Sequence, residues 1–448
     1  MRNRNMVKVL KNFLVRQVFS DEKRSESYTG SLTTRGRTSN RPPGSIHVVN
    51  GCDFGDGEYQ ATMCVEISSS KIVTVIGSLN MKGQVEILGV GEQRLKDAQR
   101  GLSYNVMKIA RAIRSSVADA MEMSGLQNLA DVCSNYSGPL FIKSLIEILI
   151  KDDTRQEIVE RDIERLQELM YMMISPPGEE VILIQPEHYT IDDIPRIVDP
   201  VGMTGKRIEG YFRSVAGNVQ ILKVVDRCIG QADLSLKAIY PNILASAEAV
   251  LLDEEKEGSI AVIDIGASTT HLAVFKDGVL IHAETIQLGG SAITRDIQHF
   301  TGLTFEKSEL LKLNYSRFHA AEVSDDAVIY VDQFNGRRRM AIRTRELGSV
   351  VEARMEELIS LAYGKILASL DDSEPGLGIV LAGAGIALFP GIEELVRRVT
   401  GSRCCVGHPD LYLTPNEKLG KGLVNKLESP RYATCIGLLK LTLKSRNP

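Results

Sequence analysis

A regular alternation of apolar runs and small polar turns occupies residues 259–286. One apolar run extends from Ile260 to Ile263 and a second from Leu272 to Phe275, with a turn of small residues between them. The pair Asp277-Gly278 is a strong hairpin signal, and another apolar-rich stretch follows it. The pattern therefore predicts three consecutive antiparallel strands with a polar tip between the first two.

The same plan occurs near the start of the chain. Apolar stretches predict strands at 62–68, 71–79 and 85–90, and an acid followed by serines separates the first two. Apolar residues then recur at helical spacing, which predicts a helix over 104–124. Ordered structure is thus expected from about residue 60, in the form of a repeated strand–strand–strand–helix unit.

A third region, 378–400, predicts a buried strand that runs into a glycine turn and then a helix at 393–400. Glycines in such a turn allow the backbone to approach a flat or phosphorylated ligand closely. The turn between the predicted strands at 260 and 272 carries a carboxylate, Asp264, and three hydroxyls. Such a turn can hold a phosphate on amides and hydroxyls while the carboxylate binds Mg²⁺ through water. An ordinary hairpin with a polar tip would have the same composition.

Composition excludes several classes of protein. The 448 residues are enough for two or more domains, and the net charge of −4 gives no reason to expect nucleic acid as a partner. The seven cysteines are scattered without metal-ligand spacing, which is typical of reduced thiols in a cytosol. The sequence contains no apolar run long enough to span a bilayer.

The first 59 residues differ from the rest of the chain in composition. Residues 1–19 are basic, contain no acid and place apolar residues on one side of a helical wheel, so they predict an amphipathic helix. Residues 20–59 have the composition of a flexible linker. The basic segment predicts a membrane tether, with Leu10, Phe13, Leu14 and Phe19 inserting into the lipid. An upstream extension from a misplaced start codon and an organelle transit peptide are the alternatives.

Several longer segments, in this order along the chain, resemble one family. They are Gln185-Pro-Glu-His-Tyr-Thr-Ile-Asp192, Asp199-Pro-Val-Gly-Met-Thr-Gly205, Leu288-Gly-Gly-Ser-Ala-Ile-Thr294, Phe305-Glu-Lys-Ser-Glu309 and Tyr432-Ala-Thr-Cys-Ile-Gly437. Together with the three turns they resemble the FtsA family of bacterial cell division proteins, a branch of the actin-like ATPase superfamily. The similarity extends from about residue 60 to about residue 440.

The resemblance implies an α/β, actin-like two-lobed fold of duplicated ribonuclease-H-like domains, with an FtsA-type 1C subdomain in the first lobe. The implied limits are 60–127, 203–256 and 426–448 for domain 1A, 128–202 for 1C, 257–298 and 341–425 for 2A, and 299–340 for 2B. The implied ligands are ATP and Mg²⁺, in the cleft between the lobes.

The resemblance also implies the residues of the nucleotide site. The turn between the predicted strands at 62–68 and 71–79 would approach the phosphates, and the turn after Asp264 would hold them. The glycine turn after the strand at 378 and a pair of residues on one helix would contact adenosine. These residues are Glu66, Ser68, Ser69, Ser70, Lys71, Asp264, Gly266, Ala267, Ser268, Thr269, Thr270, Gly290, Glu309, Lys312, Gly383, Ala384 and Gly385, with Asp264 beside the metal. Without the resemblance, Glu309 and Lys312 would be taken as a solvated pair on one helix face.

The chain departs from the family pattern at several positions. Ser68, Ala267 and Ser268 stand where glycines are usual, and His271 stands where an acid is often found. The region 238–244 offers no acid to position an attacking nucleophile. Nucleotide binding is therefore better supported than turnover, hydrolysis is expected to be slow at most, and no catalytic residue is assigned. A small-molecule kinase of this fold and a scaffold that no longer hydrolyses ATP are the alternative functions.

The partners implied by the resemblance are the C-terminal tail of FtsZ through domain 2B, further copies of the chain in a filament, and other division proteins through domain 1C. The chain would work on the inner face of the cytoplasmic membrane at the division site. No nucleic acid is expected.

Overall fold

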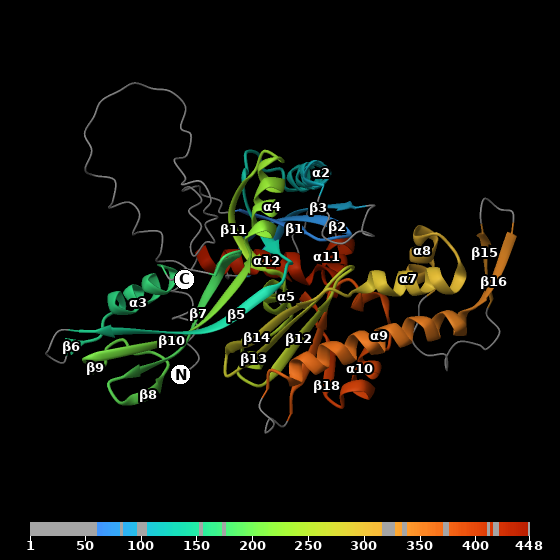
Figure 1. Cartoon of the computed structure of the whole chain (residues 1–448). Helices are drawn as coiled ribbons and strands as arrows, with labels where there is room; N and C mark the ends of the chain where they lie inside the picture. The colour runs from blue at the N-terminus through green and yellow to red at the C-terminus, as the bar shows by residue number, and fades with distance from the viewer. Residues whose placement is uncertain are drawn as a thin grey trace.

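The computed structural model describes residues 61–446, apart from 81–83, 96–104, 152–155, 173–175, 316–327, 334–337, 371–375, 410–412 and 415–420 (Figure 1). The expected basic segment 1–19 and linker 20–59 lie outside the described residues.

The first lobe is built on a mixed sheet with the strand order β11-β4-β1-β2-β3-β19. The predicted meander is confirmed, since β1 pairs antiparallel with β2 and β2 with β3, while β4 and β11 add parallel strands beyond β1. Every residue of β1 is buried, which explains why its centre, Met63 to Val65, is apolar without alternation. The strands are β1 Thr62–Ile67, β2 Lys71–Leu79, β3 Val85–Arg94, β4 Asp131–Tyr136, β11 Ser235–Pro241 and β19 Leu413–Thr414.

The second lobe repeats this topology. Its sheet has the order β14-β13-β12-β17-β18, again an antiparallel meander followed by two parallel strands. Asp277 and Gly278 both have positive φ (51° and 79°), as a two-residue hairpin turn requires. The strands are β12 Ile260–Ile265, β13 Thr270–Lys276, β14 Val279–Ile286, β17 Gly378–Ala382 and β18 Arg403–Val406. The expected duplication of an α/β unit is therefore confirmed.

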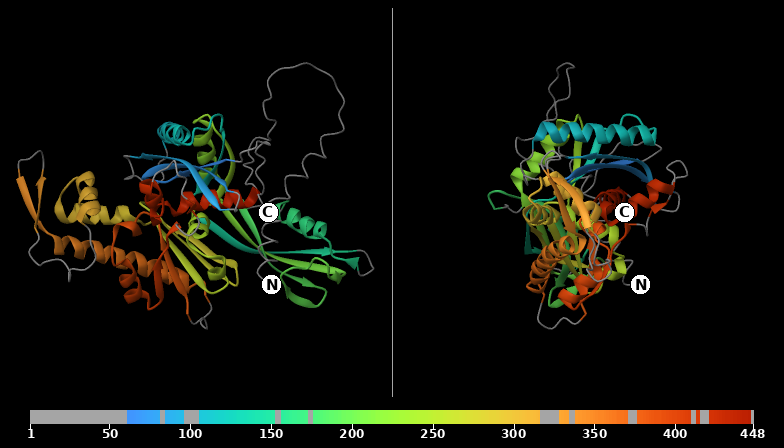
Figure 2. Two further views of the ribbon diagram at one scale, coloured as in Figure 1. Left: turned by 180° about the vertical axis from the view of Figure 1, so that it is seen from behind. Right: turned by 90° about the vertical axis from the view of Figure 1, so that its right-hand side faces the viewer.

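Helices cover the outer faces of the two sheets (Figures 1 and 2). In the first lobe, α2 packs on β2 and β3, and α4 packs on β4 and β11; in the second, α9 packs on β13 and α10 on β18. The buried side chains of α2 and α4 share one apolar core, and those of α7, α9 and α10 share another. The helices are α2 Val106–Ser124, α4 Val219–Gly230, α7 Gly290–Thr301, α9 Thr344–Leu367 and α10 Ile392–Thr400.

An inserted sheet of order β5-β10-β7-β8 extends from the first lobe, with α3 packed on one face (Figure 1). Its limits differ from the expected 128–202. β4 lies in the first lobe's sheet, because it pairs with β1, whereas β10 lies in the inserted sheet, because it pairs along its length with β5 and β7. The elements are β5 Leu140–Ile150, β6 Gln156–Glu157, α3 Glu160–Met172, β7 Glu179–Ile191, β8 Ile194–Ile197, β9 Thr204–Gly205 and β10 Arg207–Asn218.

A smaller unit extends from the second lobe at the other end of the molecule (Figure 1). It contains α8 Phe305–Tyr315 and the hairpin of β15 Val328–Gln333 and β16 Arg338–Arg343. Most of it lies within the expected range 299–340, although β16 continues to Arg343 before α9 begins.

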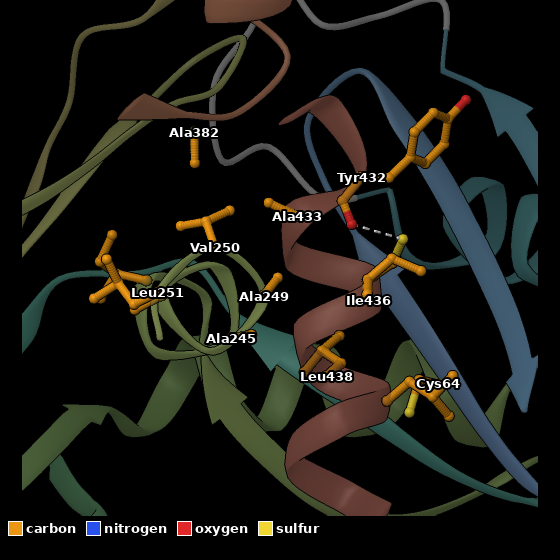
Figure 3. Packing of buried hydrophobic residues seen from close by; sticks show 14 of the residues in the cluster. Cys64, Ala245, Ala249, Val250, Leu251, Ala382, Tyr432, Ala433, Ile436 and Leu438 are labelled. Carbon is orange, nitrogen blue, oxygen red and sulfur yellow. Dashed lines mark hydrogen bonds between the residues drawn. The ribbon is translucent and has the colours of Figure 1, made fainter. Parts of the chain in front are cut away.

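Two helices cross each other between the lobes. α5 Asn242–Val250 follows β11 of the first lobe but contacts β12 and β13 of the second, and α12 Ala433–Arg446 contacts β1, β2 and β4 of the first. The two helices cross so closely that a Cβ on Gly437 would overlap the carbonyl oxygen of Ala245. Their small and aliphatic side chains form one core with residues of both sheets (Figure 3).

No helix in the described part of the chain combines the length and the apolar character needed to cross a membrane.

The crossing yields a prediction about stability. Gly437→Ala should lower the free energy of unfolding by about 1–3 kcal/mol, because the added methyl group forces α5 and α12 apart. Gly364→Ala is the matched control, since Gly364 also lies inside a helix but has nothing within 4 Å of an added Cβ. That control should be neutral or stabilising by up to about 1 kcal/mol. Urea unfolding of both variants measures the difference, and equal stabilities would contradict the assigned crossing.

Candidate functional site

A cleft lies between the two lobes, where the β1–β2 turn faces the β12–β13 turn. The expected residues that line it are Glu66, Ser68, Ser69, Ser70, Lys71, Asp264, Gly266, Ala267, Ser268, Thr269, Gly383 and Ala384. The remaining expected residues, Thr270, Gly290, Glu309, Lys312 and Gly385, are not among the residues that line the cleft. The three turns therefore converge on one cavity, while the helical pair does not reach it.

Asp264, at the end of β12, is almost fully buried at 3% exposure. Its Oδ2 accepts hydrogen bonds from the Ser246 hydroxyl, from Thr434 Oγ1 at 3.3 Å and from Asn242 Nδ2 at 3.4 Å. Burial raises the pKa of the Asp264 carboxyl, and the hydroxyl donors together with the charge of Lys71 oppose that rise. The three donors come from α5 and α12, so the crossing helices fix the orientation of this carboxylate.

The turn after β17 closes against the same carboxylate. Gly383 has φ of 97°, and a Cβ there would collide with Asp264 Oδ1. Its amide donates to the carbonyl of Pro430 at 3.1 Å. Only glycine combines this backbone conformation with such a close approach. The glycine turn therefore bounds the cleft beside Asp264.

Glu66 and Lys71 lie on the other side of the cleft, and each is at most 5% exposed. Lys71 Nζ lies 4.0 Å from Glu66 Oε2, donates to the carbonyl of Arg431 at 2.8 Å and lies 4.4 Å from the Tyr432 ring centroid. Glu66 Oε2 has no hydrogen-bond partner although it is buried. Burial raises the pKa of Glu66; Lys71 lowers it and Asp264 raises it. Two carboxylates thus share one nearby ammonium group.

The β12–β13 turn is held from both sides. Gly266 N–H donates to the carbonyl of Thr269 at 2.9 Å, and Ser291 at the start of α7 donates its amide to the carbonyl of Ala267 at 2.7 Å. Thr270 Oγ1 donates to the carbonyl of Leu288 at 2.8 Å, which explains why Thr270 is buried below the turn. Ser268 Oγ lines the cleft yet is inaccessible and without a hydrogen-bond partner. An unsatisfied hydroxyl at this place fits a phosphate-binding turn.

Glu309 and Lys312 form the expected i,i+3 pair, with 2.7 Å between Nζ and Oε2. Lys312 Nζ also donates to the carbonyl of Gly290 at 3.0 Å and to Thr294 Oγ1 at 2.8 Å. Because a lysine has three N–H groups, these contacts use all of them. Burial lowers the pKa of Lys312. In this structure the pair secures the first turn of α7 and does not reach the ligand cleft.

Sequence reasoning missed several residues of the site. Asn242, Thr434, Asn105, Lys108, Ser137, Arg295 and Arg431 also line the cleft, and Ser246 holds Asp264 without lining it. Lone hydroxyl and amide residues inside apolar helices carry no local signal. His271, noted in the sequence as a departure from the family pattern, is 3% exposed and lines the cleft.

No group of three or more His, Cys, Asp or Glu side chains in the described residues could hold a metal together. Mg²⁺ commonly binds through one or two carboxylates, with water and phosphate oxygens completing its shell. The arrangement of Asp264 near Glu66 therefore fits Mg²⁺ with a phosphorylated ligand better than a metal held by protein alone.

Comparison with known proteins agrees with this geometry. The family model described as "Cell division protein FtsA" matches residues 261–437, and the one described as "SHS2 domain inserted in FTSA" matches 141–216, which is the inserted sheet. The chain is 28% identical to the cell division protein FtsA of Neisseria meningitidis over 85% of this chain and 89% of that one. It is 26% identical to that of Escherichia coli over 84% and 88%.

Among solved structures, the one described as "PilM-PilN type IV pilus biogenesis complex" has a TM-score of 0.61 at 15% identity, and covers 85% of this chain and 98% of that one. This likeness concerns the fold alone.

Two lobes of repeated topology, two crossed helices between them and a cleft lined by three polar turns define an actin-like protein. The inserted sheet narrows the class further, because it matches the model described as "SHS2 domain inserted in FTSA". The chain belongs to the FtsA family of cell division proteins.

Proposed function

We propose that this chain binds ATP with Mg²⁺ in the cleft and assembles into filaments that join the FtsZ ring to the cytoplasmic membrane. The observation that carries the nucleotide proposal is the convergence of three polar turns, at Ser68, Ser268 and Gly383, on one cleft. The two buried carboxylates Asp264 and Glu66 share the ammonium group of Lys71, and Arg431 also lowers the pKa of Glu66. A divalent cation beside the two carboxylates would add positive charge for the phosphates, whose oxygens would accept hydrogen bonds from the turn.

Binding rather than rapid turnover fits the residues present. The carboxylates that line the cleft are Glu66 and Asp264, and Asp264 already accepts three hydrogen bonds. Asn242 stands where a water-positioning acid would be needed and donates to Asp264 instead. Bound Mg²⁺ would supply charge neutralisation at the phosphates. Besides Glu66 and Asp264, the described residues that line the cleft include no acid that could serve as the base a small-molecule kinase needs for its acceptor.

The test of nucleotide binding uses Asp264→Asn. The variant keeps the size of the side chain and removes its charge, so the affinity for Mg²⁺–ATP should fall at least about tenfold, which is the ~1.4 kcal/mol of a weakened charged contact. Asp233→Asn is the control, because Asp233 is exposed and its φ of 64° suits asparagine. Calorimetric titration with and without Mg²⁺ measures both. Unchanged affinity in Asp264→Asn would contradict the site, and no binding by the parent chain would favour a scaffold that has lost its nucleotide.

Self-assembly is proposed through the two ends of the molecule. At the inserted sheet Ile150 is 68% exposed, and on the β15–β16 hairpin Tyr330 is 67% exposed. These elements lie at opposite ends in Figure 1. Different apolar surfaces at opposite ends favour head-to-tail contacts that do not close. The unit of α8, β15 and β16 is the proposed contact for the FtsZ tail. The inserted sheet is the proposed contact for other division proteins.

Ile150→Glu should leave the fold intact and remove most of the polymer that sediments with nucleotide, because a charge at the contact costs desolvation. Leu361→Glu is the control, since Leu361 is an exposed apolar residue on α9 between the ends. Pelleting assays compare the two variants. Polymer formed by Ile150→Glu at the parent level would argue against this end of the molecule as a contact.

The membrane contact is proposed for residues 1–19, which lie outside the described residues. Their basic, acid-free sequence suits anionic headgroups, and the 40 residues from 20 to 59 would span roughly 35 Å as a flexible coil. The whole chain should therefore float with vesicles of anionic lipid, and a version that begins at residue 21 should not. Equal flotation of both would place the membrane contact elsewhere.

A further inference from the structure

His271 connects the β12–β13 turn to the base of the inserted sheet. Its Nε2 lies 3.1 Å from Thr269 Oγ1 in the cleft, and its Nδ1 lies 3.0 Å from Thr285 Oγ1 on β14. Thr285 Oγ1 in turn lies 2.9 Å from the carbonyl oxygen of Gly138, to which it donates. Four residues from the two lobes therefore form one continuous hydrogen-bonded chain.

Counting protons fixes the direction of each bond. The hydroxyl proton of Thr285 goes to the Gly138 carbonyl, which can only accept, so Thr285 Oγ1 must accept from His271 Nδ1–H. Burial lowers the pKa of His271 to about 4, so the ring is neutral near neutral pH and its Nε2 carries no proton. Thr269 must then donate its own proton to His271 Nε2. In this arrangement the Thr269 hydroxyl has no proton left for a ligand in the cleft.

We propose that His271 is a positioning residue that reverses this chain when a phosphate enters the cleft, so that the Gly138 carbonyl loses its donor. The inference rests on the proposed binding of nucleotide. To bind a phosphate oxygen, Thr269 turns its proton toward the ligand and accepts from His271 Nε2–H. The neutral ring then has a bare Nδ1, which accepts the proton of Thr285 in place of Gly138. The same three protons serve both arrangements, so no acid or base is taken up.

Gly138 is well placed to report this change. It lies between β4 of the first lobe and β5 of the inserted sheet, where the chain enters the insertion. The chain leaves the insertion at Asn218, whose amide donates at 2.7 Å to the Tyr136 hydroxyl. Tyr136 donates in turn to the carbonyl of Pro139 at 2.9 Å. Entry and exit are thus tied together beside Gly138, and the loss of one hydrogen bond there acts on both connections of the inserted sheet.

The chain of bonds also depends on the chemistry of a histidine at position 271. A carboxylate at position 271 could accept from Thr269 and Thr285 but could not donate to either. An imidazole can exchange its donor and acceptor atoms while staying neutral. The proposed reversal therefore requires histidine, and neither an acid nor an apolar residue of similar size could perform it.

The experiment records nitrogen spectra of ¹⁵N-histidine-labelled chain, free and saturated with ADP–Mg²⁺ or AMPPNP–Mg²⁺, with the His271 signal assigned by its loss in His271→Phe. The expected result is an Nδ1–H ring in the free protein and an Nε2–H ring in the bound protein. Thr285→Val should abolish the exchange, because the ring loses its fixed partner, and Thr285→Ser should restore it. Thr442→Val, a buried threonine of α12, is the matched control and should exchange as the parent does.

Calorimetry on the same samples separates the two proposals. If nucleotide does not bind, the proposed function and this inference both fail. If it binds while His271 keeps its Nδ1–H form, or becomes protonated on both nitrogens, only this inference is overturned, since Gly138 then keeps its donor. An exchange that persists in Thr285→Val would also overturn it.

Discussion

The crossing of α5 and α12 is the contact on which the rest of the molecule depends. α12 packs on the sheet of the first lobe and α5 contacts strands of both lobes, so one apolar core includes strands from both. The lobes cannot separate without exposing that core, at a cost of ~25 cal/mol for each Å² of apolar surface. Because the backbones meet at Gly437 and Ala245, the crossing allows small rotations of the lobes but little change of distance.

The same crossing builds the cleft. The first and second turns of α5 supply Asn242 and Ser246, the first turn of α12 supplies Thr434, and all three donate to Asp264. A cation or phosphate that changes the charge around Asp264 therefore acts directly on the two helices that join the lobes. This gives a physical route from an occupied cleft to lobe orientation, which is what a nucleotide-dependent filament requires.

The local part of this structure could be predicted from the sequence, and the non-local part could not. The meanders follow from apolar runs and from turns such as Asp277-Gly278, which act within a few residues. The membership of β10 in the inserted sheet depends on pairing with β5, about sixty residues earlier in the chain, and no local pattern records it. Likewise, i,i+3 spacing predicts the Glu309–Lys312 pair. The contact of Lys312 with the Gly290 carbonyl could not be predicted, because it depends on how α8 packs against α7.

The departures in the β12–β13 turn have a common physical consequence. Ala267 and Ser268 add side chains where glycine would leave the backbone open, and His271 places a neutral ring where an acid would add negative charge. Fewer carboxylates near the phosphates lessen the repulsion that a bound anion meets, but they also remove groups that could orient an attacking water. In the proposed nucleotide site, the turn is therefore better suited to holding a phosphate than to hydrolysing it, and the proposed response of the crossed helices and of the His271 chain depends on whether the cleft is occupied.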